Sequence, residues 1–264
     1  MTHVLRTRIL RWPSADAARI GEVDVKVYAA SLLADAERVE RAVDLLSAPE
    51  HDRFSRYGNS VVARRFAIGR AIAREILGAL RSEAPSAVQI VDGVHGKPML
   101  WSNCSASPIS FSIAHCDDLL LVAVSRRGEV GVDVERVRSI DSWERVAERT
   151  FAPAECAQLI RAVERGSEAD GLFLRQWCRL EAQLKAIGCG INGIDAHRAG
   201  QTPPGLRVAD LKTLPLPPDL AALPARYLGA VALFVPDGRS ARQTARAASQ
   251  QSTPTTAPTR ASTA

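Results

Sequence analysis

The sequence lacks a long apolar run and a recognisable export signal. The longest uninterrupted apolar stretch is Leu119–Val124, which is far too short to cross a bilayer, so no membrane-spanning segment is expected. The N-terminal region contains arginines but no continuous apolar segment and no small-residue cleavage pattern. These absences predict a cytoplasmic protein that does not act at a membrane.

Cysteine, histidine and aromatic residues are few, and their spacing excludes several kinds of site. The five cysteines include no CxxC pair and are odd in number, which argues against a disulfide framework and a thiolate zinc site. The five histidines form no HxxxH or HExxH pattern. Aromatic residues make up 5% of the chain and no dense Lys/Arg block exists, so nucleic acid is not an expected partner. The formal charge of +5 fits a phosphate-bearing ligand or an acidic partner.

Apolar periodicity predicts an α+β chain. The expected helices include two long ones with broad apolar faces, at Arg64–Leu80 and Gly171–Ile187. Strands are expected at Val23–Ala29, Ile109–Ile113, Leu119–Ser125, Val130–Val134 and Tyr227–Val235. The second, third and fourth of these strands follow one another closely, which predicts an antiparallel meander.

The pattern of elements suggests two halves and a tail. We expect an N-terminal half at residues 1–105 and a C-terminal half, with the metal site, at 106–236. Residues 237–264 are rich in Ser, Thr, Ala, Pro and Gln, and we expect them to be disordered and dispensable for activity.

Two carboxylates stand two residues apart in the segment Gly131–Glu135. On a strand, Asp133 and Glu135 project from the same face and repel each other. A divalent cation would relieve the repulsion, and hard oxygen ligands favour Mg²⁺, Mn²⁺ or Ca²⁺. From this segment alone, a solvated strand edge is favoured over a metal site by roughly two to one, since carboxylates on wet faces are common.

A second pair of charges lies on the predicted helix that contains Trp177–Lys185. Glu181 and Lys185 are four residues apart, and they flank the apolar stripe where the rim of a cleft would be. The alternative is an exposed ion pair that stabilises the helix by about 0.3–0.5 kcal/mol. Two further segments are weak signals alone: Phe111–His115 ends a strand in a histidine, and the loop Gly93–Pro98 exposes Lys97.

Together these segments resemble the Sfp-type 4′-phosphopantetheinyl transferase family. That family shows a GKP loop, a strand of the form F-N-x-S/T-H-S, then G-x-D-x-E, then W-x-x-K-E-A/S-x-x-K. The chain has, in the same order and with similar spacing, Gly96-Lys97-Pro98, Phe111–His115, Gly131–Glu135 and Trp177–Lys185. The resemblance runs from about Val23 to Val235, and the ordered set reverses the odds on the two carboxylates.

The resemblance implies a fold and a reaction. The fold would be two similar α/β halves with antiparallel sheets, related by a pseudo-twofold axis, with a ligand cleft between them. The reaction would move 4′-phosphopantetheine from coenzyme A, the substrate, to a serine of an acyl, polyketide or peptidyl carrier protein. It would require Mg²⁺ and release adenosine 3′,5′-bisphosphate. Such carrier activation serves fatty-acid synthesis and secondary metabolism, and a monomer is expected.

The resemblance also assigns roles to residues. The metal-binding acids would be Asp133, Glu135 and Glu181. Glu181 would also be the base that takes the serine proton, and Lys185 would contact the phosphates. The residues matched to coenzyme A binding are Arg65, Lys97, Pro98 and His115.

Several positions depart from the family pattern. Leu180 stands where many members have lysine, so one phosphate-facing cation is missing. Ser112 replaces the usual Asn, and Ala114 replaces the usual Ser or Thr beside His115. His51 and Phe54 also lie where relatives often have lysines. These departures motivate one alternative, a relative that binds coenzyme A or a carrier protein with little transfer, and the basic tail motivates another, an unrelated basic binding protein.

Overall fold

A computed structural model describes most of the chain. It covers residues 9–11, 25–58, 60–93, 95–101, 109–211, 216–221 and 225–236. The predicted tail at 237–264 lies outside these residues. Within the described part, no helix is both long enough and apolar enough to span a membrane.

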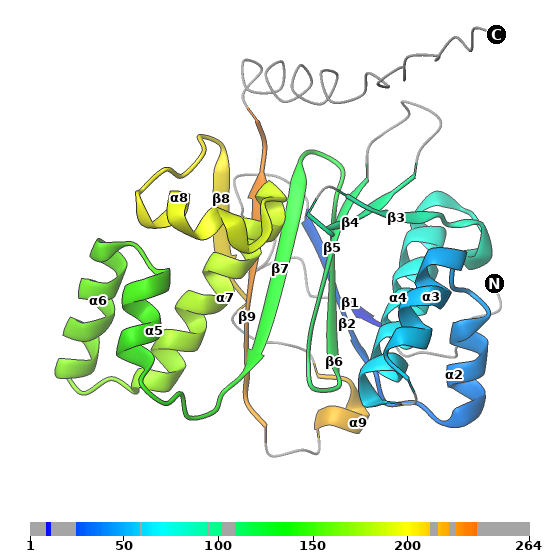
Figure 1. The fold of residues 1–264 in the computed structure, drawn as a ribbon, viewed down its shortest axis with the longest axis horizontal. Coiled ribbons are helices and arrows are strands. Elements are labelled where there is room, and N and C mark those ends of the chain that lie inside the picture. The colour runs from blue at the N-terminus through cyan, green and yellow to red at the C-terminus, as the bar shows by residue number, and fades with distance from the viewer. Residues whose placement is uncertain are drawn as a thin grey trace, which may run out of the picture.

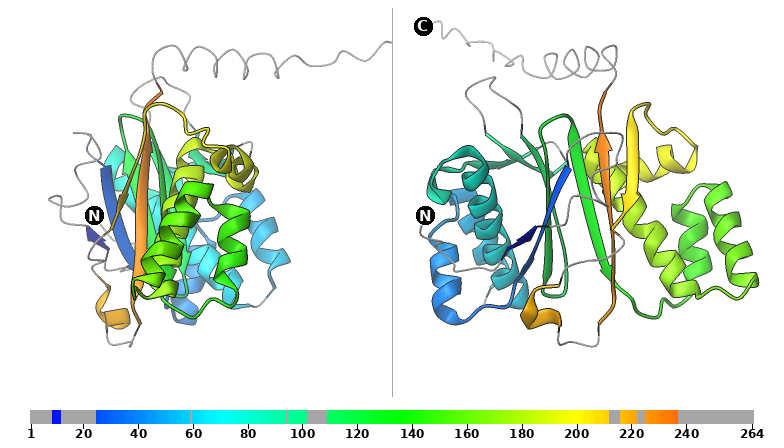
Figure 2. Two further views of the ribbon diagram at one scale, coloured as in Figure 1. Left: turned by 90° about the vertical axis from the view of Figure 1, so that its left-hand side faces the viewer. Right: turned by 180° about the vertical axis from the view of Figure 1, so that it is seen from behind.

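The elements alternate between strands and groups of helices. The first part of the chain forms β1 (Leu10–Arg11), β2 (Val25–Ser31), α2 (Ala36–Val43), α3 (Ala48–Arg56), α4 (Val61–Arg81), η1 (Pro85–Ala87), β3 (Ile90–Asp92), β4 (Pro98–Leu100), β5 (Ser110–Cys116) and β6 (Leu119–Ser125). The second part forms β7 (Glu129–Arg136), α5 (Trp143–Thr150), α6 (Pro153–Glu164), α7 (Ala169–Ile187), η2 (Gly190–Gly193), α8 (Ile194–Arg198), β8 (Leu206–Asp210), α9 (Pro218–Ala221) and β9 (Tyr227–Phe234). Helices α2 to α4 lie at one end of the molecule and α5 to α8 at the other, with the main sheets between them (Figure 1). Seen from the side, the strands lie along one side and these helices along the other (Figure 2).

The two main sheets repeat one connection pattern. The first has the order β1-β2-β6-β5 and the second β7-β9-β8, and the described strand pairings are antiparallel. In each sheet a strand is followed by a group of helices, α2 to α4 after β2 and α5 to α8 after β7, and two later strands then join that sheet so that the last one lies in the middle. The expected α+β class with antiparallel sheets is therefore confirmed.

The predicted three-stranded meander is wrong at its third strand. β5 and β6 pair as expected, but the backbone partner of β7 among the described strands is β9, along its whole length. The sequence could not show this, because β9 comes almost a hundred residues later in the chain than β7. β5 and β6 share a sheet with β2, although the predicted division at 105/106 assigns them to the second half; the division itself stays a prediction.

β6 lies at the centre of the molecule, with both of its faces buried. Leu120, Val122 and Val124 pack into one apolar cluster with α4, whereas Leu119, Leu121 and Ala123 pack into a second cluster that includes β7 and β9. This double burial is why the strand is a continuous apolar run rather than an alternating one.

Helix α7 packs directly on β7 because both surfaces are small at the contact. A Cβ atom placed on Gly131 would lie 2.0 Å from the Ala182 carbonyl oxygen and 2.5 Å from the Ala186 backbone nitrogen. Only glycine permits so close an approach. The charged side chains of α7 and β7 that flank this contact are consequently brought together.

Candidate active site

Asp133 and Lys185 form the centre of the site. Asp133 projects from the middle of β7 and is 7% exposed, and Lys185 comes from the last turn of α7. The Lys185 Nζ atom donates a hydrogen bond to Asp133 Oδ1 at 2.6 Å. Among the described residues, the other carboxylate oxygen, Oδ2, is buried and forms no hydrogen bond of ordinary geometry, although the Cys178 thiol lies near this carboxylate. One oxygen of a buried carboxylate is thus left unsatisfied, which is costly unless a ligand supplies a partner.

Two of the predicted metal acids, Glu135 and Glu181, lie close enough to act on the third, Asp133. Burial raises the pKa of Asp133, the Lys185 ammonium opposes this, and the carboxylates of Glu181 and Glu135 raise it further. Within the described residues Glu181 forms no hydrogen bond or ion pair. The cluster therefore holds three carboxylates against Lys185 and Arg138, and at Asp133 itself the balance raises the pKa above its ordinary value.

Glu135 is the best anchored of the three acids. Its Oε2 atom accepts a hydrogen bond from Arg138 at 2.7 Å and one from the Cys116 thiol at 3.7 Å. Burial raises the pKa of Cys116, and the Glu135 charge adds to the effect, so the thiol stays protonated and donates. Cys116 and Arg138 were not singled out from the sequence.

These acids fit a divalent cation by their chemistry. Carboxylate oxygens are the ligands that Mg²⁺ prefers, and the unsatisfied Asp133 Oδ2 and the unpaired Glu181 provide two of them. As the side chains stand, the described residues contain no group of three or more His, Cys, Asp or Glu that could hold a metal ion. The Lys185 ammonium balances part of the negative charge of the three carboxylates through its ion pair with Asp133. The metal assignment of these residues stays a prediction.

His115 and Arg65 extend the site toward the first sheet. Arg65, on α4, donates from Nε to Asp118 Oδ1 at 2.8 Å, in the turn between β5 and β6. Desolvation lowers the pKa of His115, and the positive charges of Arg65 and Lys185 lower it further. His115 is therefore neutral at pH 7 and lies within electrostatic reach of two cations. The fold brings these three basic side chains to one place from α4, β5 and α7.

Lys97 and Pro98 lie at the other end of β7. The Lys97 ammonium pairs with Glu129 Oε2 at 2.8 Å, four residues before Asp133, which on a strand is about 13 Å away. Its Cδ atom lies 3.9 Å from where a Cβ of Gly188 would be, just beyond α7. Pro98 begins β4 opposite Asp92. The GKP loop is thus placed beside the C-terminal end of α7, away from the acid cluster.

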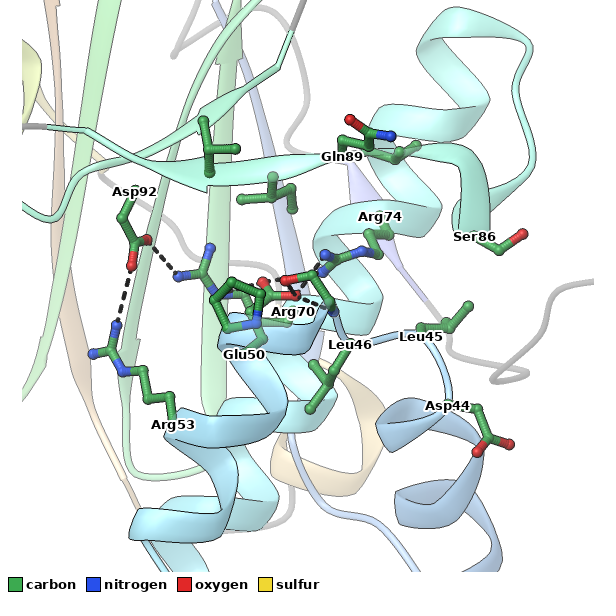
Figure 3. Close-up of a pocket in the computed structure, with 15 residues that line it drawn as sticks. Asp44, Leu45, Leu46, Glu50, Arg53, Arg70, Arg74, Ser86, Gln89 and Asp92 are labelled. Carbon is green, nitrogen blue, oxygen red and sulfur yellow. Dashed lines mark hydrogen bonds and ion pairs between the residues drawn. The ribbon is translucent and has the colours of Figure 1, made fainter. Parts of the chain in front are cut away.

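A pocket formed by described residues lies elsewhere in the molecule. It has a volume of about 470 Å³ and is lined by α3, α4 and β3 (Figure 3). Inside it, Glu50 Oε2 accepts from Arg74 Nη2 at 2.6 Å, and Arg70 lies between Glu50 and Asp92. None of the predicted site residues lines this pocket, so it is not the expected ligand cleft.

Comparisons with known proteins identify the family of the chain. The model of the 4′-phosphopantetheinyl transferase superfamily matches residues 129–213, which run from β7 past β8 and contain all three acids and Lys185. The chain is 34% identical over 170 residues to the 4′-phosphopantetheinyl transferase HetI of Nostoc sp., covering 64% of this chain and 70% of HetI. It is 36% identical over 149 residues to the protein slr0495 of Synechocystis sp. (56% and 59% covered). It is also 33% identical over 100 residues to the 4′-phosphopantetheinyl transferase AcpT of Salmonella typhimurium (38% and 50% covered).

The fold and the site define an α+β protein with an acid and lysine cluster between a strand and a helix. The chain belongs to the 4′-phosphopantetheinyl transferase superfamily. Its enzyme type is that of a phosphopantetheinyl transferase, and the predicted family is confirmed at this level.

Proposed function

We propose that the protein transfers 4′-phosphopantetheine from coenzyme A to a serine of an acyl, polyketide or peptidyl carrier protein. Adenosine 3′,5′-bisphosphate is the other product. The observation that carries the proposal is the buried Asp133, which has an unsatisfied oxygen and two further carboxylates beside it. A protein gains no stability from such an arrangement, whereas a site for a cation and a phosphate requires it.

The residues that would hold Mg²⁺ are Asp133, Glu135 and Glu181. When bound, the ion neutralises charge on the pyrophosphate of coenzyme A and so favours attack at phosphorus. Among the protein's own groups, Lys185 lies at the acid cluster and supplies a positive charge for a phosphate oxygen. Glu181, which makes no other bond within the described residues, accepts the proton of the serine hydroxyl.

In the transfer step, the serine oxygen forms a bond to the phosphorus nearest the pantetheine arm. The bond from that phosphorus to the bridging oxygen breaks, and the nucleotide leaves with that oxygen beside the Lys185 ammonium. The serine proton passes to Glu181. Arg65 and His115 are the groups for the 3′-phosphate, because Arg65 is a permanent cation and His115 can gain a proton beside an anion. Lys97 and Pro98, near the end of α7, are assigned to the rest of the nucleotide.

The two sheets suggest how the substrate is held. The repeated connection pattern supports a pseudo-twofold relation between halves, with the cleft for coenzyme A along β5, β7 and the end of α7. We further propose a cytoplasmic monomer that acts on acidic carrier proteins and binds no nucleic acid.

One assay tests the transfer directly. The protein is mixed with coenzyme A, Mg²⁺ and an apo carrier protein, and the carrier is weighed by mass spectrometry. The proposal predicts the gain of one phosphopantetheine mass, which EDTA abolishes. Acyl, polyketide and peptidyl carriers are tested in parallel, because the site does not distinguish them. A carrier mass that stays unchanged for all three classes would reject the proposed activity.

A second candidate function is binding of coenzyme A or a carrier protein with little transfer. Leu180 is 1% exposed and packs with Phe173 and Leu184 in an apolar cluster, so its place cannot supply a phosphate-facing cation. Measured binding of coenzyme A by calorimetry, without any mass gain on a carrier, would favour this second function.

A further inference from the structure

Strands β5 and β7 are joined by side chains of β5. The hydroxyl oxygen of Ser110 accepts the Val130 N–H at 3.1 Å, and that of Ser112 accepts the Val132 N–H at 3.2 Å. The Cys116 sulfur accepts the Arg136 N–H at 3.3 Å. Each pair is separated by 20 residues in the chain, so the two strands run side by side in constant register. Because β9 pairs with the other edge of β7, these side chains bridge the two main sheets.

Cys116 differs from the two serines because it also contacts a predicted metal acid. Its thiol donates to Glu135 Oε2 at 3.7 Å, while Arg138 donates to the same oxygen at 2.7 Å. Two donors, one from β5 and one from the segment after β7, thus hold this oxygen. The other oxygen, Oε1, takes part in neither bond and is the one left for a ligand.

The neighbouring residues reinforce the contact. The Arg136 side chain forms an ion pair with Asp117 at 3.0 Å. Residues 116 and 117, where β5 ends, therefore bind residues 135 and 136 of β7 through several contacts. His115 precedes Cys116 directly in β5. Cys116 therefore connects His115, which is proposed to bind the nucleotide, to Glu135 of the acid cluster.

We propose that Cys116 is a positioning residue for the transferase. Its thiol orients the Glu135 carboxylate so that Oε1 faces the cation. The same hydrogen bond keeps Glu135 at a fixed position relative to His115. The inference rests on the proposed function for its catalytic meaning. Its structural part, the bond between thiol and carboxylate, does not. Loss of one such bond leaves Glu135 free to rotate about Arg138, which weakens the site without removing a ligand.

Infrared spectroscopy tests the bond without metal or substrate. The S–H stretching band that disappears in Cys116→Ala belongs to Cys116. In Glu135→Ala this band should shift, because the thiol loses its acceptor. A band at the same frequency in Glu135→Ala and in the unchanged protein would overturn the inference, whatever the enzyme's activity.

Metal binding tests the positioning role. Mn²⁺ binding, followed by electron paramagnetic resonance, should weaken about fivefold in Cys116→Ala, as expected for the loss of one hydrogen bond of about 1 kcal/mol. Cys116→Ser keeps a donor and an acceptor and should restore affinity to within about twofold of the unchanged protein. Cys189→Ala is the matched control, since Cys189 is also half-buried but lies beyond the end of α7.

The outcomes separate the inference from the proposed function. A shifted S–H band with equal Mn²⁺ affinity in Cys116→Ala would overturn the positioning role while transfer by the unchanged protein stands. Weakened binding in Cys189→Ala of the same size would also overturn it. If the unchanged protein binds no Mn²⁺ and modifies no carrier, the proposed function fails, and with it the catalytic meaning of Cys116, even where the band shifts.

Discussion

Each part of the molecule contains a buried cluster of charges, and the two clusters are built in opposite ways. Between α3 and α4, Glu50 is surrounded by two buried arginines and by the backbone and hydroxyl of Ser47, so its oxygens are saturated (Figure 3). Between β7 and α7, Asp133 has Lys185 on one oxygen and, among the described residues, no hydrogen bond of ordinary geometry on the other.

The pKa values record this difference. Burial works to raise the pKa of Glu50, but the bonds from Arg74 and Ser47 outweigh it, and the pKa falls below its ordinary value. The pKa of Asp133 rises, because burial and the carboxylates of Glu181 and Glu135 outweigh Lys185. A saturated cluster contributes to stability, whereas an unsaturated one has capacity left for a ligand. The comparison therefore separates a structural role from a functional one.

The largest expected effect comes from Glu50→Gln. The change removes the carboxylate that Arg74 and Arg70 share and leaves Arg70 with Asp92 alone, so it should lower the free energy of unfolding by about 3–5 kcal/mol. Urea denaturation measures this. Glu37→Gln, at an exposed ion pair on α2, is the control and should change it by less than about 1 kcal/mol. Transfer per folded molecule should survive Glu50→Gln; loss of transfer in fully folded protein would break the comparison.

Asp133→Asn should have the opposite effects to Glu50→Gln: transfer should be largely lost while stability rises. We expect transfer to fall by about 10²–10³-fold, because the amide cannot supply an anionic oxygen to a cation. The mass-based carrier assay measures the rate. The free energy of unfolding at pH 7 should rise, because the raised pKa of Asp133 means that its ionisation costs stability in the fold. A variant that both transfers normally and unfolds more easily would assign Asp133 a structural role.

Lys185→Met should show that the lysine acts on the phosphates rather than on the fold. Methionine keeps the length of the side chain but removes the charge, so we expect transfer to fall by about 10²-fold. Arg179→Met is the control, because Arg179 lies on the same helix as Lys185 but pairs with Asp210 of β8. Equal turnover in Lys185→Met and the unchanged protein would remove Lys185 from the mechanism.

The smallest effect is a dependence on pH. Ionised Glu50 has a lowered pKa, so the stability that it provides is present above its unfolded pKa and is lost as the pH falls. Asp133 has a raised pKa, so its ionisation costs stability at neutral pH, and this cost disappears as the pH falls through that raised value. Unfolding curves between pH 7 and acid should show Glu50→Gln less stable and Asp133→Asn more stable than the unchanged protein, with both differences shrinking in acid. If both variants were less stable, or both more stable, than the unchanged protein, the assignment of a structural role to Glu50 and a functional role to Asp133 would be contradicted.

The sequence predicted the elements better than their arrangement. The long helices and the strand Leu119–Ser125 follow from local periodicity, and β6 has those bounds. The pairing of β7 with β9 was missed because it depends on a contact between segments far apart in the chain, which periodicity does not encode. The motif order correctly indicated the family, because four short segments in one sequence order are an unusual coincidence.

The charged residues of the candidate site could be found from the sequence, and their role as metal ligands stays a prediction; the residues that support them could not be found. Asp133, Glu135, Glu181 and Lys185 carry charges in recognisable spacings. Cys116 was missed because its role depends on the register between β5 and β7, although small polar residues at Ser110, Ser112 and Cys116 all fall on one face of the strand. The buried pair of Glu50 and Arg74 was missed because charges in a helix are expected at the surface.

β6 has a consequence for how the molecule folds. Because opposite faces of this one strand complete two separate apolar clusters, neither cluster can form fully before the strand is in place, and its loss would open both. Heating should therefore produce a single cooperative transition rather than one for each sheet. Cutting the chain between β6 and β7 should yield fragments that are insoluble alone and become soluble when expressed together.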